Sequence, residues 1–243
     1  MYARRGLSAP SAPSPAAVRL AASAGTGTVT TPDDARSAMS WGEGSATSQD
    51  AAQRVNPSVL GDFCSLRTFH TMLQAYLDLV YPLIPICHIP TLLSDVHSGR
   101  GDQDPVFCIL LISMCTLVVS IVPQRLPQFA ALEQSPAFAS SRSLVSHAHT
   151  LTEALKPCGY HDQYSLEKWS IAYLWAAIFG YSSVSRRADI YFAEAQTIFA
   201  GLQLHRSRSL AHLDAPHAQV AKKAFWLMHT GYTYVSSNRS QDR

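Results

Sequence analysis

Hydrophobic residues recur at three- and four-residue steps from Leu66 onward, whereas residues 1 to about 60 show no such period. The first periodic stretch contains Leu66, Phe69, Leu73, Leu77 and Val80. This spacing places them on one face of an amphipathic helix. Pro82 and Pro85 follow, and proline removes a backbone donor and clashes with the preceding turn. The pattern therefore predicts a helix that ends before Pro82.

Residues 81–90 form an apolar, proline-rich stretch that predicts a loop packed inward. A short helix is expected to begin at Thr91 or the residue before it and to run to about Val96. The acids and proline of residues 102–105 then indicate another helix start, since acids and proline favour the first turn of a helix.

The stretch from Val106 to Val122 carries no charged residue. It is at the short limit for spanning a bilayer, which takes about 20 residues, and Ser113, Thr116 and Ser120 make it more polar. A helix that is apolar on every side also suits the centre of a helical domain. We expect a buried core helix, and a single membrane span over residues 106–122 is the alternative.

Four later helices are predicted, over residues 144–155, 166–179, 186–204 and about 218–235. The third is the most amphipathic, and Ser185 is its expected cap. Its stripe consists of Ala188, Tyr191, Phe192, Ala195, Ile198, Phe199 and Leu202. The inward positions expected in the fourth are Val220, Ala224, Phe225, Leu227 and Met228. No stretch alternates like a strand, so we predict an all-α fold, an irregular bundle of about seven helices.

Residues 1–60 are rich in Ala, Ser, Thr, Gly and Pro, and they predict a disordered low-complexity tail. A mitochondrial transit peptide also fits the basic, acid-free first 30 residues. Pro10, Pro13 and Pro15 argue against the amphipathic helix that such a peptide needs. The helical domain is assigned to residues 61–243.

The charge balance disfavours nucleic-acid binding, because 19 Lys and Arg oppose 17 Asp and Glu without a basic stripe. We expect no direct DNA binding by this chain alone. The five cysteines are irregularly spaced and form no C-x-x-C pair, so neither a zinc site nor a disulfide framework is predicted. Cys87, Cys108 and Cys115 are expected to be buried, reduced thiols.

Ten histidines raise the question of a metal or catalytic site. His147 and His149 are two residues apart and so lie on different helix faces, and no H-E-x-x-H motif occurs. Nucleophile elbows, P-loops and G-x-G-x-x-G loops are also missing from the sequence. We predict no catalytic, cofactor or metal residues. The alternative is a helical enzyme with a His and carboxylate site assembled from distant segments.

Three segments resemble the regulatory middle homology region of fungal binuclear-zinc-cluster transcription factors. The first, within residues 76–92, matches the pattern Pro-x-x-Pro-Ile-x-His-x-Pro-Thr-Phe, with Leu92 in place of the final Phe. The second runs from Tyr191 to Arg206, and the third from Lys222 to Met228. The residues that carry the resemblance are Tyr81, Pro82, Pro85, His88, Pro90, Thr91, Glu194, Ala195, Leu202, Leu204, His205, Phe225 and Trp226.

The matched residues are expected to be structural. Tyr81, Pro82, Pro85, His88 and Pro90 should fix a buried turn, with His88 a hydrogen-bonded core histidine. Phe225 and Trp226 are expected to be core anchors.

The resemblance implies regulation of transcription in the nucleus, for example of a nutrient-use or secondary-metabolite gene cluster. Partners would be another transcription factor or co-regulator, with a small effector as a second candidate, and no membrane. The family's zinc cluster needs six cysteines, and residues 1–60 contain none, so zinc is expected only if an upstream cluster exists. After residue 228 the sequence departs from the family pattern, and we expect a domain truncated at its C-terminus.

Overall fold

The computed structural model describes the backbone of residues 59–241 and the side chains of residues 60–231. This part of the chain is helical and contains no strand, which confirms the all-α prediction. The tail predicted for residues 1–60 lies outside the described residues, except for its last two, which open α1 (Val59–Phe63).

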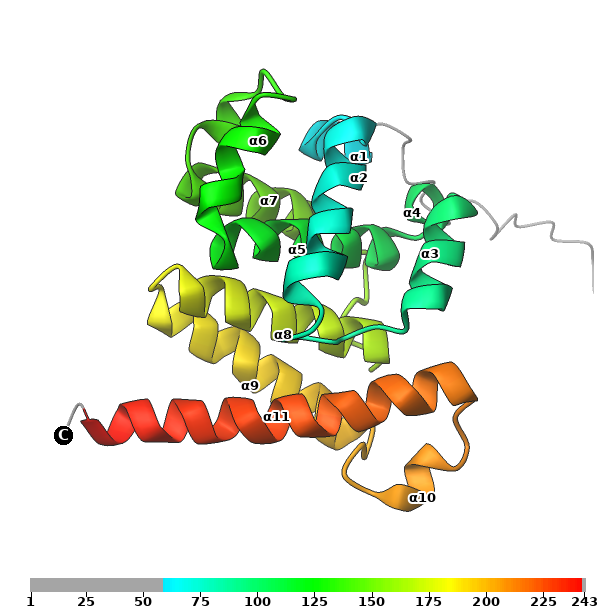
Figure 1. Ribbon diagram of the computed structural model, residues 1–243. Helices are drawn as coiled ribbons and strands as arrows, with labels where there is room; N and C mark the ends of the chain where they lie inside the picture. Colours follow the sequence, from blue (N-terminus) through cyan, green and yellow to red (C-terminus); the bar gives the residue numbers. More distant parts are fainter. Residues whose placement is uncertain (1–58, 242–243) are drawn as a thin grey trace, which may run out of the picture. The chain divides into compact units, whose positions relative to one another are not determined.

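The sequence places α5 (Pro105–Ile121) at the centre of the domain (Figure 1). Asp104 caps it, because its Oδ1 accepts the N–H groups of Val106 at 2.9 Å and Phe107 at 3.2 Å. The predicted helix start is therefore confirmed, with Pro105 in the first turn. Every residue from Phe107 to Val119 is buried, as expected for a core helix.

Among the described residues, no single helix is long and apolar enough to cross a membrane. Only α5 taken together with residues 123–130 passes that test of length and composition, and the two parts are bent by 101° at their junction.

The other helices are arranged around α5. Before it come α2 (Leu66–Ala75), a π-helical turn over Tyr76–Val80, α3 (Ile89–His97) and α4 (Arg100–Gln103). After it come a 3-10 turn over Pro123–Arg125, α6 (Leu126–Ala130), a 3-10 turn over Pro136–Ala139, α7 (Ser141–Leu155), α8 (Leu166–Tyr181), α9 (Ser185–Gly201), α10 (Ser207–Leu210) and α11 (Ala215–Gln241).

The core is built by packing in layers. α2, α7 and α8 each pack directly on α5, and α9 packs along α8 on the side away from α5 (Figure 1). Trp169 and Trp175 of α8 are fully buried in this core. α11 adds a further layer, since the Tyr173 hydroxyl of α8 donates to the Leu227 carbonyl at 3.3 Å.

The first predicted helix ends where proline requires it, because the π turn stops at Val80 and Pro82 follows in a turn. The prediction that this helix buries its whole apolar face is wrong for one residue. Leu66 is 64% exposed, since it occupies the first helical position, next to the capping residue Ser65. Phe69, Leu73 and Val80 are buried as expected.

Several helices differ from the prediction at their ends, α9 and α11 among them. Val184, not Ser185, is the N-cap of α9, and no side chain caps that end. The helix stops at Gly201 instead of residue 204, and Gln203 follows in the left-handed region with φ 54°. α11 is longer than predicted and begins at Ala215.

Candidate functional site

The proline loop over residues 81–88 is held by side-chain hydroxyls that bond to its carbonyl groups. The Tyr76 hydroxyl donates to the Ile84 carbonyl at 2.9 Å, and the Tyr81 hydroxyl donates to the Cys87 carbonyl at 3.0 Å. Ser170 of α8 donates to the Ile86 carbonyl at 3.3 Å. These bonds satisfy acceptors that a loop lacking regular structure leaves open. The loop is consequently fixed against both α8 and the end of the first helix.

The expectation of a wholly buried turn is correct for only part of the loop. Ile84, Ile86 and Cys87 are buried. Pro82 and Pro90 are exposed. Prolines at these positions restrict the backbone and need no burial to do so. Pro90 also lies in the first turn of α3, where its missing N–H has no helical partner to lose.

His88 is the N-cap residue of α3 and is half-buried instead of lying in the core. Its ring Nδ1 lies 2.8 Å from Thr91 Oγ1. The prediction of a hydrogen-bonded histidine is confirmed, and the prediction of a core position is wrong. The start of α3 lies at the surface, since Pro90 and Thr91 are exposed, and His88 lies there with them.

Lys223 of α11 joins the third resembling segment to the first. Its Nζ donates to the Tyr81 hydroxyl at 2.6 Å and to the Cys87 carbonyl at 3.3 Å. Burial raises the pKa of the Cys87 thiol to about 12, although the Lys223 charge opposes the shift. Cys87 is therefore a neutral thiol at physiological pH, as expected for a reduced, buried cysteine.

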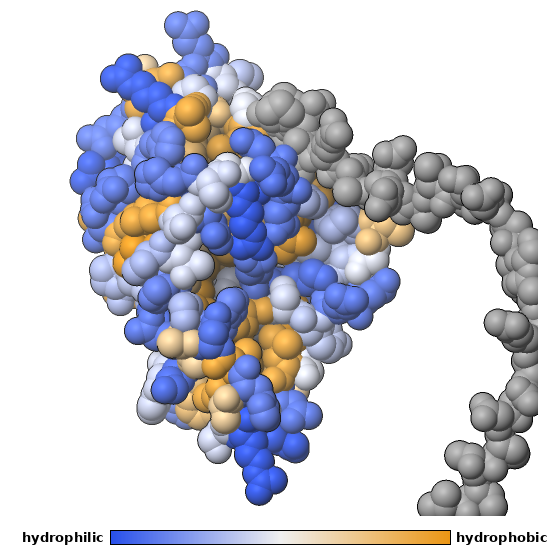
Figure 2. All heavy atoms as spheres, turned by 90° about the vertical axis from the view of Figure 1, so that its right-hand side faces the viewer, coloured by the Kyte–Doolittle hydropathy of each residue, from blue (hydrophilic) through white to orange (hydrophobic). Residues whose placement is uncertain are grey.

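A small pocket lies beside this contact, with a volume of about 80 Å³. Its walls come from the proline loop, α3, α5, α8 and the first turns of α11. The apolar wall includes Ile86, Leu92, Phe107, Leu110, Leu166 and Val220, and the polar rim includes His88, Thr91, Asp95, Glu167 and His217. The view onto the side with α3, α4 and the start of α11 shows hydrophobic residues between hydrophilic ones (Figure 2).

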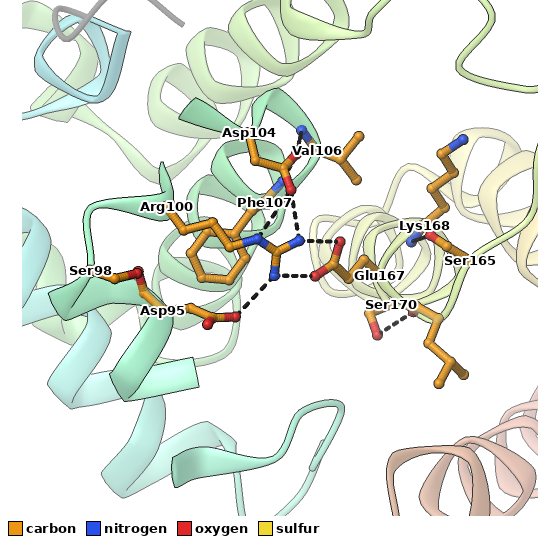
Figure 3. Close-up of polar contacts among 11 residues, drawn as sticks. Asp95, Ser98, Arg100, Asp104, Val106, Phe107, Ser165, Glu167, Lys168 and Ser170 are labelled. Atoms are coloured by element: carbon orange, nitrogen blue, oxygen red, sulfur yellow. Dashed lines mark hydrogen bonds and ion pairs between the residues drawn. The ribbon is translucent and has the colours of Figure 1, made fainter. Parts of the chain in front are cut away.

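One rim of the pocket carries a charge cluster centred on Arg100 (Figure 3). The Arg100 guanidinium pairs with Asp95 at 2.9 Å, with Asp104 at 2.7 Å and with Glu167 of α8 at 2.7 Å. Its carbon also lies 4.6 Å from the centre of the Phe107 ring, a cation–π contact. Burial lowers the Arg100 pKa, but the three carboxylates raise it more, so the net shift is upward.

The second resembling segment lies apart from the proline loop, on α9 and the turn after it. Ala195 and Leu204 are buried, Leu202 is half-buried, and His205 is exposed. Glu194 lies 3.5 Å from His161. Gly201 is required for a steric reason: a Cβ there would overlap the Tyr164 ring. None of these residues lines the pocket beside the proline loop.

The prediction that Phe225 and Trp226 are core anchors is wrong. Phe225 is 41% exposed and Trp226 is 65% exposed on the outer face of α11. The two rings contact each other, with centroids 5.7 Å apart. The inward face of this helix consists instead of Val220, Ala221, Ala224, Leu227 and Met228. That stripe has three- and four-residue steps that skip positions 225 and 226, so the sequence contained the signal.

A polar and aromatic network around His149 was not predicted. His149 Nε2 lies 2.8 Å from the Tyr191 hydroxyl, which donates to Glu153 Oε1 at 2.8 Å. Glu153 also pairs with Lys156 at 2.7 Å. The His149 ring contacts the Trp175 ring edge-on, with centroids 5.0 Å apart. The steps from His149 to Glu153 and from Glu153 to Lys156 are local, at four and three residues on α7 and its end, whereas Tyr191 and Trp175 come from other helices, so sequence spacing could not indicate their part.

Burial sets the protonation of this network. It lowers the His149 pKa, although the Glu153 charge acts in the opposite direction. Burial also raises the Tyr191 pKa, and the hydrogen bond to Glu153 adds to the shift. The ring of His149 is thus a neutral, packed imidazole. Among the described residues, no group of three or more His, Cys, Asp or Glu side chains is placed to hold a metal ion.

Searches of protein-family models, of curated proteins and of solved structures each found no match for this chain. The resemblance of the three segments to a transcription factor family is therefore still a prediction.

Proposed function

We propose that this chain regulates transcription through a helical regulatory domain of the fungal zinc-cluster type. The proposal is supported most by the contact of Lys223 with Tyr81 at 2.6 Å. Those two residues belong to resembling segments that are far apart in the sequence. Segments that carry a family pattern and also meet in space form a single structural unit.

The proposed mode of action is contact with another regulator. The chain has a formal net charge of +2, and a nearly neutral chain offers little overall attraction to phosphate backbones. The partner would be a DNA-bound transcription factor or co-regulator in the nucleus, and nutrient-use or secondary-metabolite genes are the proposed targets. The proposal gives the His149 network a structural role, since its imidazole is packed against aromatic rings.

The test is a reporter assay in a fungal host. The full chain is fused to an unrelated DNA-binding domain, and transcription from a matching promoter is compared with that of the DNA-binding domain alone. We expect the fusion to change transcription in one direction. Lys223→Met should weaken the effect, because it breaks the contact with Tyr81, whereas Lys222→Met changes the exposed neighbour and should not.

A fusion that leaves the reporter at the level of the DNA-binding domain alone would contradict the proposal. If Lys223→Met and Lys222→Met changed the reporter signal equally, the effect on transcription would not depend on the contact with the proline loop. Specific binding of promoter DNA by the purified, unfused chain would contradict the proposed mode of action through a partner.

A further inference from the structure

We propose that the pocket beside the proline loop binds a small organic ammonium ion with a short apolar body. The inference concerns binding alone, so it does not depend on the proposed role in transcription. It rests on the shape of the pocket, on the free acceptor at its rim and on the sign of the charge there.

The pocket has the size of a small ligand. A buried water needs about 10–15 Å³ of such space, so a volume of about 80 Å³ holds about five to eight groups of that size. Ile86, Leu92 and Val220 supply apolar walls from three separate elements. Small-molecule sites are commonly apolar concavities with a few polar groups that fix the orientation of the ligand.

The charge at the rim is negative. Asp95, Asp104 and Glu167 supply three carboxylates against the one guanidinium of Arg100, which leaves two negative charges in excess. Cys87, His88 and His217 are the other titratable groups of the lining. Lys223 adds one positive charge beside Cys87, and Asp214 adds one negative charge beside His217, so the excess of negative charge remains. An anion would therefore meet net repulsion at this rim.

The hydrogen bonds decide which partner the rim can accept. Every nitrogen of the Arg100 guanidinium is already engaged with a carboxylate. Both oxygens of Asp104 and both oxygens of Glu167 each accept at least one hydrogen bond already. Within the described residues, Asp95 Oδ1 has no donor, and its open position is visible in Figure 3. A ligand can therefore donate a hydrogen bond to Asp95 Oδ1, whereas Arg100 has no N–H group left to donate to a ligand.

An ammonium group fits these conditions. It would donate to Asp95 Oδ1 and add a positive charge where two negative charges are in excess, while its alkyl body would contact the apolar wall. A charge-assisted hydrogen bond is stronger than a neutral one, so a neutral alcohol of the same shape should bind about tenfold more weakly.

The experiment measures binding to the purified full chain by NMR titration. The probes are isobutylamine, which is protonated at neutral pH, isobutanol as the neutral match, and isobutyrate as the anion. We expect the ammonium to bind most tightly, the alcohol about tenfold more weakly, and the carboxylate not to bind. The shifted signals should belong to the pocket walls.

Three variants test the assignment. Asp95→Asn keeps an acceptor oxygen for Arg100 and should weaken the ammonium about tenfold without changing the alcohol. Asp78→Asn removes the same charge from an exposed position away from the pocket and should change neither. Leu92→Phe adds volume inside the pocket and should abolish binding of both. Thermal unfolding of each variant confirms that it is folded.

Equal binding of the ammonium and the alcohol would overturn the proposal, and so would failure of all three probes to bind. An equal loss in Asp95→Asn and Asp78→Asn would show unspecific charge attraction and would also overturn it.

Discussion

Gly231 offers the sharpest test of how α11 is placed. It lies in the interior of α11, where glycine destabilises a helix by about 1 kcal/mol relative to alanine. The structure gives a reason for it: a Cβ at Gly231 would lie 2.9 Å from Phe192 Cε2 and 3.2 Å from Phe192 Cζ. Phe192 is 9% exposed and belongs to α9, so its ring has little room to move.

The magnitude follows from two opposing effects. Gly231→Ala gains about 1 kcal/mol of helix propensity. Overpacking a close contact costs about 1–3 kcal/mol. We expect the cost of overpacking to exceed the gain in helix propensity, so that the variant is destabilised by about 1 kcal/mol. Gly180→Ala is the matched control in α8, because a Cβ there meets nothing within 4 Å. It should stabilise the domain by about 0.5–1 kcal/mol.

Thermal unfolding separates the two variants. For a domain of this size 1 kcal/mol corresponds to about 2–4 °C in Tm, so the two midpoints should differ by about 3–8 °C. Adding Phe192→Leu to Gly231→Ala should recover part of the loss, with a coupling of about 0.5–3 kcal/mol. If Gly231→Ala instead stabilises the protein as much as Gly180→Ala does, α11 does not approach Phe192 as described here.

Four other variants, of which Lys222→Met is a control, probe titratable groups. Lys223→Met should destabilise the domain by about 1–2 kcal/mol. Lys222→Met, at an exposed position, should destabilise it by less than about 0.5 kcal/mol. If urea denaturation gave the same loss of stability for both variants, the contact of Lys223 with the proline loop would be contradicted. Arg100→Met leaves three carboxylates without their cation and should lower the stability of the domain by about 2 kcal/mol, a value between those of exposed and buried ion pairs. An unchanged stability would mean that the cluster is fully solvated. His149 has a lowered pKa, so the unfolded chain takes up a proton first as pH falls below 6.5. Stability should therefore fall on acidification, and His149→Gln should reduce that slope in Tm measured against pH.

The sequence by itself determined which segments are helical and where several of them stop. Proline fixed the end of the first helix before Pro82 and the start of α5 at Pro105, because its effects on the backbone are local. The absence of charge over residues 106–122 predicted a buried core helix with a membrane span as the alternative, and the structure shows α5 buried from Phe107 to Val119. Short elements such as α4 and α10 carry too few residues for a periodic signal and were not predicted.

Only the tertiary structure decided which polar groups meet. Arg100 pairs with Glu167, Lys223 with Tyr81, and His149 with Tyr191, although no spacing in the sequence relates the partners. Helical periodicity reports which face of one helix is apolar, but pairing across helices depends on how they cross and on the register of their contact. The pocket and its open carboxylate oxygen arise from five elements in this way, and therefore no local pattern could have predicted them.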